Sequence, residues 1–245
     1  MKYQKYTFDK IKYAIDTRTY SKALDLYEKL KVINFERHGY YCSAEVLGTS
    51  KYKVKVSIFH FDEGECDCYL GQQDILCKHM IALAIYSIFE GKPIPKQTKE
   101  VVSSPKSSGK IGKLTPEEIK NIKMKVYQAI RYIKPYNGPS RIWFSYQASL
   151  LEGCNRLATI ISRLPVSLES ADLIVKLMIR LDKKLVSGGV DDSDGTVGTF
   201  IENCVQLIIG FCELDICCKK AIKQLAGISS CFDWEEPLLK LISER

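Results

Sequence analysis

The sequence lacks the features that mark membrane proteins and common enzyme classes. It has no run of about 18 or more apolar residues, so we expect no membrane span and no membrane partner. It also lacks a Gly-rich phosphate loop, a Gly-x-Ser-x-Gly segment and a His-Glu-x-x-His segment. No apolar stretch follows the basic residues at the N-terminus, so we expect no signal peptide.

The few histidines and many cysteines of the chain bear on whether it is an enzyme and where it is located. Two of the three histidines, His38 and His60, flank strand-like sequence and have no nearby nucleophile. Ten cysteines without a signal peptide are typical of a reducing interior. We therefore expect an intracellular protein, cytoplasmic or nuclear if the source is eukaryotic, that is not an enzyme and has no small-molecule substrate.

One short segment concentrates metal-binding side chains. Cys66, Cys68, Cys77 and His79 lie within fourteen residues, as a Cys-x-Cys pair and a Cys-x-His pair separated by eight residues. Three thiolates and an imidazole satisfy a closed tetrahedral Zn²⁺ site, which is the structural kind. The sequence therefore predicts one structural Zn²⁺ held by these four residues. His60 is an alternative ligand, six residues before Cys66.

The same segment resembles a known family. The Cys-x-Cys and Cys-x-His pairs, Lys78 between the last two ligands, and the aliphatic residues after His79 resemble the SWIM-type zinc finger over roughly residues 25–90. The chain is similar to a bacterial form with an all-helical C-terminal domain. This resemblance implies a DNA-binding or protein-interaction module.

Hydrophobic periodicity predicts an α+β chain in two parts. A helix opening at Ser21 precedes strand-like runs at 31–37, 40–47 and 52–59, and an apolar helix follows His79. We expect a small zinc-stabilised ββα domain with an N-terminal helix at 1–90. Residues 91–113 are rich in Lys, Ser, Pro and Gly, and predict a flexible basic linker.

Residues 114–245 show only helical patterns. Thr115 and Pro116 predict a helix start, and further helices are expected at about 140–163, 168–186 and 196–225, with a short one after Asp233. Long helices with short connections predict an all-α bundle or a short helical-repeat domain.

A polar loop before the predicted helix at 196 contains Asp191, Asp192 and Asp194. It fails the EF-hand calcium template, because Val190 and Ile201 occupy positions that require acidic ligands. The loop is either a helix N-terminus capped by Ser193 or Asp194, or an interaction loop. The helix N-terminus is the favoured interpretation, and the resemblance to bacterial SWIM-type proteins with similar Asp-rich segments keeps the interaction loop as the alternative.

The net charge of +7 is uneven, and two functional hypotheses follow from it. In the first, a nucleic acid binds Lys51, Lys53, Lys55 and Lys78 around the finger, together with the basic linker. In the second, the chain is a protein adaptor whose helical domain docks a protein partner. Neither hypothesis assigns a catalytic residue.

Overall fold

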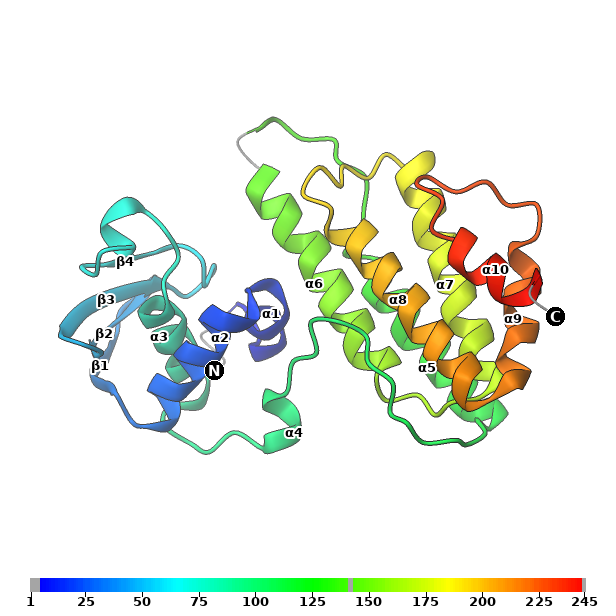
Figure 1. Cartoon of the computed structure of the whole chain (residues 1–245). Coiled ribbons are helices and arrows are strands. Elements are labelled where there is room, and N and C mark those ends of the chain that lie inside the picture. The colour runs from blue at the N-terminus through cyan, green and yellow to red at the C-terminus, as the bar shows by residue number, and fades with distance from the viewer. Residues whose placement is uncertain (1–4, 141–142, 244–245) are drawn as a thin grey trace. The chain divides into compact units, whose positions relative to one another are not determined.

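The computed structural model describes residues 5–140 and 143–243. The chain forms two compact units, residues 1–101 and 102–245, each with its own hydrophobic core (Figure 1). Residues 1–4 of the first predicted domain, and residues 141–142 of the predicted helix at 140–163, lie outside the described part. The α+β class is confirmed.

Unit 1 is a four-stranded antiparallel sheet with helices packed on one face. Its helices are α1 (Phe8–Ala14), α2 (Thr17–Glu28), η1 (Gly71–Gln73), α3 (Lys78–Phe89) and α4 (Lys96–Lys99). Its strands, in sheet order, are β1 (Val32–Arg37), β2 (Tyr41–Leu47), β3 (Lys51–Ser57) and β4 (Gly64–Cys66). The short strand β4 was not predicted, because three residues carry too little periodicity to identify a strand.

Side-chain alternation decides which face of the sheet is covered. On β3, Val54 and Val56 are buried, whereas Lys53 and Lys55 point to solvent. The buried face packs against α3, whose residues from His79 to Ile85 are all buried. Helix α2 packs on α3 in turn, and it begins at Thr17 rather than at Ser21 because the Asp16 carboxylate accepts a hydrogen bond from the Thr19 amide.

Unit 2 is all-helical among its described residues. Its long helices are α5 (Pro116–Ile130), α6 (Trp143–Ile161), α7 (Leu168–Val186) and α8 (Thr196–Leu214). The short elements that follow are η3 (Ile216–Cys218), α9 (Lys219–Ile222), η4 (Lys223–Leu225) and α10 (Glu236–Ser243). Thr115 is the N-cap of α5, as predicted, and it forms a capping box with Glu118.

The prediction of one helix over 196–225 is wrong. Helix α8 ends at Leu214, and Asp215 takes an extended conformation in which its carboxylate accepts a hydrogen bond from the Cys217 amide. A local side-chain bond of this kind competes with the helical pattern. Helix α8 is long and apolar enough to cross a membrane, but Phe200 and Ile208 on it lie in the core of unit 2.

The segment predicted as a linker, residues 91–113, is shared between the units. In unit 1, the hydroxyl groups of Tyr20 and Tyr27 donate hydrogen bonds to the carbonyls of Lys99 and Lys92. In unit 2, Ile111 forms a parallel bridge with Val166. The boundary between the units, after residue 101, therefore falls inside this segment.

Candidate metal centre

Two structural elements bring the four predicted ligands together. Cys66 ends β4, where it lies opposite Val54 of β3, and Cys68 follows in the next turn. Cys77 is the N-cap residue of α3, and His79 lies in the first turn of that helix. The eight residues between Cys68 and Cys77, here called the zinc loop (69–76), connect the sheet to the helix.

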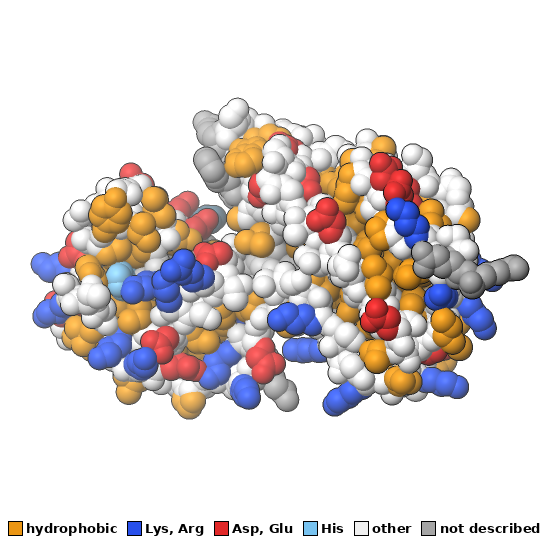
Figure 2. Space-filling view, in the orientation of Figure 1, with side chains coloured by type: hydrophobic (Ala, Val, Ile, Leu, Met, Phe, Trp, Pro, Cys, Tyr) orange, Lys and Arg blue, Asp and Glu red, His pale blue; other side chains and the backbone are white. Residues whose placement is uncertain are grey.

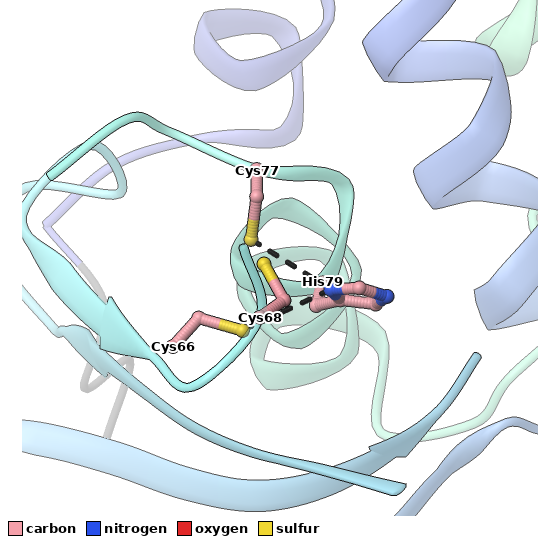
Figure 3. Close-up of side chains that lie close together, drawn as sticks. All are labelled: Cys66, Cys68, Cys77 and His79. Atoms are coloured by element: carbon pink, nitrogen blue, oxygen red, sulfur yellow. Dashed lines mark hydrogen bonds between the residues drawn. The ribbon is translucent and has the colours of Figure 1, made fainter. Parts of the chain in front are cut away.

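The ligand atoms have the spacing of a tetrahedral zinc site. The three sulfur atoms and a nitrogen of His79 all lie within 4.8 Å of one another, and all four residues are buried (Figure 3). His79 Nδ1 is 3.8 Å from Cys66 Sγ and 3.8 Å from Cys77 Sγ. Zn–S and Zn–N bonds of ordinary length place the corners of a tetrahedron roughly 3.5–3.8 Å apart. The residues therefore fit one structural Zn²⁺, as predicted.

The orientation of His79 assigns its ligand nitrogen. Nδ1 faces the sulfur atoms, whereas Nε2 is buried and has no hydrogen-bond partner among the described residues. The ring stacks on Tyr52 with centroids 4.3 Å apart, which holds its plane. A Cβ added at Gly48 would lie 2.8 Å from Nε2. Packing against Tyr52 and Gly48 thus orients the histidine.

The zinc loop approaches the ligands too closely for a side chain at Gly71. The Gly71 amide donates a hydrogen bond to Cys68 Sγ at 3.4 Å, and a Cβ at Gly71 would lie 2.2 Å from the Cys66 carbonyl oxygen. Outside the loop, the Asp67 carboxylate accepts a hydrogen bond from the Lys53 amide. These contacts fix the Cys-x-Cys turn to β3.

The electrostatics of the cluster favour thiolate at Cys77. Hydrogen bonding from Cys66, and then from His79, lowers the pKa of the Cys77 thiol to about 4. The same hydrogen bond with Cys77, together with burial, raises the pKa of Cys66. A bound Zn²⁺ would supply the positive charge that lets all three cysteines ionise. His60 is exposed and lies outside the cluster, so it is not a ligand here.

Comparison with known families agrees with this geometry. Residues 52–88 match the family model of the SWIM zinc finger. This span contains β4, the zinc loop and all but one residue each of β3 and α3. The chain therefore carries a SWIM zinc finger with a Cys₃His zinc site. No curated protein and no solved structure matches the chain.

The structure places the predicted nucleic-acid-binding lysines among carboxylates. Lys51, Lys53 and Lys55 lie on the exposed face of β3, and Lys78 is half-buried in the first turn of α3. Lys51 forms an ion pair with Glu45 at 3.4 Å, and Lys55 forms one with Glu65 at 3.3 Å. The sequence could not show this pairing, because it depends on the register between strands.

The predicted Asp-rich loop joins α7 to α8. Asp191 accepts a hydrogen bond from Trp143 Nε1, and Asp192 accepts from the amides of Val197 and Gly198. Burial raises the pKa of Asp192. The N-cap residue of α8 is Gly195, not Ser193 or Asp194. The amides of the first turn are instead satisfied by the side chain of Asp192, and Asp194 accepts a hydrogen bond from the Thr196 amide.

Sequence reasoning missed a set of exposed apolar side chains on the zinc loop. Tyr69, Leu70 and Ile75 are 75%, 41% and 47% exposed. Figure 2 shows hydrophobic side chains gathered at this end of unit 1. A Tyr-Leu pair directly after a ligand and an Ile shortly before the next were the available signal.

Proposed function

We propose that the chain is a non-catalytic zinc-binding protein whose SWIM finger contacts another protein. The observation that carries this proposal is the charge balance on the exposed face of the sheet. Lys51 is paired with Glu45, and Lys55 is paired with Glu65. Lys53 forms no ion pair with a described residue but lies opposite Glu45 in the strand register. Phosphate binding relies on uncompensated positive charge, so this balance favours a protein partner.

The charges around the groove on this face make the argument more specific. Besides Lys53 and Lys55, the groove is lined by five carboxylates, those of Glu36, Glu45, Glu65, Asp67 and Asp74. In the sheet register, Lys53 lies directly opposite Glu45, and Lys55 lies opposite Glu65. The groove is therefore predominantly acidic and complements a partner segment that carries Lys or Arg.

The zinc loop supplies the apolar part of the proposed surface. Tyr69 and Leu70 lie next to the acidic groove, because Gly71 and Asp74 of the same loop line it. Exposed tyrosine is enriched at the centres of protein interfaces, where it buries a large area at low entropic cost. Zn²⁺ would hold the loop at both ends, through Cys68 and Cys77, and so preorganise this surface.

Three further expectations belong to the same proposal. A tetrahedral site with four protein ligands leaves no position for a reactive water, which supports a structural rather than a catalytic zinc. Free cysteines in both units are consistent with a location inside the cell. Docking of a partner by unit 2 remains the alternative protein-adaptor hypothesis.

The test is affinity capture with tagged full-length chain from its native source, followed by identification of bound proteins. We compare the wild type with Tyr69→Ser combined with Leu70→Ser. The matched control is Ile216→Ser, which removes an exposed apolar side chain in unit 2. We expect a protein partner retained by the wild type and the control but lost by the zinc-loop variant.

Equal recovery with all three proteins would contradict the finger surface and leave unit 2 as the docking site. Zinc content of the variants is measured first, so that loss of binding is not confused with loss of the metal. The affinity for the purified partner is then measured at increasing salt concentration. We expect it to fall, because salt screens contacts with an acidic groove.

A further inference from the structure

One segment of unit 2 carries many positive charges and few carboxylates. Residues 102–134 contain eight Lys and Arg residues and only two Glu residues. Four members of this segment recur at spacings of three and four on α5 and its C-cap, namely Lys120, Lys123, Tyr127 and Arg131. Such spacing places them along one side of the helix. All four are exposed.

Helix α7 adds to the same side. The guanidinium of Arg180 lies over the Tyr127 ring, 5.4 Å from its centroid. One turn further along α7, Lys184 donates a hydrogen bond to the Ile133 carbonyl. Burial, and then repulsion from Arg180, lowers the pKa of Lys184. Like charges are therefore concentrated where α7 meets the end of α5.

No carboxylate neutralises this group within the described part of the chain. Lys120, Lys123, Arg131 and Arg180 form no ion pair with a described Asp or Glu, whereas Lys51 and Lys55 of the finger each form one. The nearby Lys176 is already paired with Asp172. We call Lys120, Lys123, Tyr127, Arg131 and Arg180 the basic cluster.

The opposite side of α5 packs against the core of unit 2. Ile122 and Val126 pack against the core of unit 2, and Ala129 and Ile130 are buried in it. Binding in a membrane surface requires a free apolar face that enters the lipid. The packing of α5 therefore favours a ligand that meets only the polar side of the helix.

We propose that the basic cluster binds single-stranded nucleic acid, with the lysines and arginines contacting phosphates and Tyr127 stacking on a base. From Lys120 to Arg131 the row extends about 16 Å along the helix, which corresponds to about five nucleotides of one strand. Tyr127 is 55% exposed, and Arg180 beside it offers a second planar group for stacking. This site is separate from the finger surface proposed above.

The experiment measures fluorescence anisotropy of a labelled oligothymidylate of about 20 nucleotides, long enough to span the row, with the zinc-loaded full-length chain. We compare wild type with Lys120→Glu combined with Lys123→Glu. The matched control is Lys53→Glu combined with Lys55→Glu, which makes the same charge change on the finger.

Between about 50 and 200 mM salt, the wild type should lose affinity steeply. The α5 variant should bind at least about tenfold more weakly, with a salt slope smaller by about 1.4, since each single-strand phosphate contact contributes about 0.7. The finger variant should bind within about twofold of wild type. Tyr127→Ala should bind the oligonucleotide about tenfold more weakly than wild type, because it removes the stacking ring.

Unchanged affinity of the α5 variant, or equal losses from both charge reversals, would overturn the proposal. So would binding to phosphatidylserine vesicles without binding to the oligonucleotide. Tryptophan emission confirms that unit 2 of each variant is folded, and the neutral pair Lys120→Gln and Lys123→Gln repeats the test without introducing repulsion. Because the finger surface is tested with a protein partner, failure of either proposal is distinguishable from failure of the other.

Discussion

At the scale of single residues, the metal centre depends on two glycines that leave room for the ligands, as well as on the ligands themselves. Gly71 lets the zinc loop pass against the Cys66 carbonyl, and Gly48 leaves room beside His79. Tyr52 stacks on the His79 ring. Such neighbours orient the ligands, and their loss typically weakens metal binding without removing a ligand.

Substitution of Gly71 by alanine should weaken zinc binding. The new methyl group would lie 2.2 Å from the Cys66 carbonyl oxygen, so the loop must move away from the first cysteine pair. We expect zinc affinity to fall by about 10–100-fold, measured by competition with a chromogenic chelator. Gly39→Ala is the control, since no atom lies within 4 Å of its Cβ. Equal affinities for the two variants would contradict the role of Gly71.

The four ligands could be predicted from the sequence because a Cys₃His site is encoded by residue type and spacing. The residues around them could not. The roles of Gly48 and Tyr52 follow from packing between distant segments, which the sequence alone does not reveal. The ion pairs of Lys51 and Lys55 likewise follow from strand register rather than from local sequence.

At the scale of elements, the Asp-rich loop stabilises the start of α8. Asp192 accepts two backbone amides, from Val197 and Gly198, at 2.8 Å each. Unpaired amides at a helix N-terminus need such an acceptor. The same loop contacts α6 through the bond between Trp143 and Asp191. The loop is therefore part of the structure of unit 2, whether or not it also contacts a partner.

Asp192→Ala should destabilise unit 2 by about 1–2 kcal/mol, the usual cost of losing a helix cap. Urea denaturation followed by tryptophan emission measures it, because the chain has two tryptophans, Trp143 and Trp234, and both lie in unit 2. Asp192→Asn keeps an acceptor oxygen and should therefore destabilise unit 2 less than Asp192→Ala does. If alanine and asparagine leave the midpoint unchanged, Asp192 does not stabilise the start of α8.

Elements with strong end signals were predicted well. Thr115 and Pro116 mark the start of α5 correctly, and α7 has its predicted bounds of 168–186. Weak signals failed. Strand β4 exists because its residues pair with β3, and α8 ends where the Asp215 carboxylate bonds to the Cys217 amide rather than where the apolar pattern ends.

At the scale of the whole molecule, the chain contains two separate cores and two kinds of charged surface. The core of unit 1 is built on the sheet, α2 and α3, and the core of unit 2 on α5 to α10. The groove of the finger is predominantly acidic, whereas the basic cluster of unit 2 is unpaired among the described residues. The net charge of +7 does not reveal the difference between these two surfaces, because it does not show which lysines lie beside a carboxylate.

The central claim is that a single zinc ion stabilises unit 1 and that unit 2 folds without it. The most direct measurement is metal content of the purified full-length chain, followed by circular dichroism and tryptophan emission during chelation. We predict one zinc per chain, and a loss of dichroism from unit 1 on chelation with unchanged emission from Trp143 and Trp234. A chain that holds no stoichiometric zinc, or that keeps its full dichroism after the metal is removed, would contradict the account.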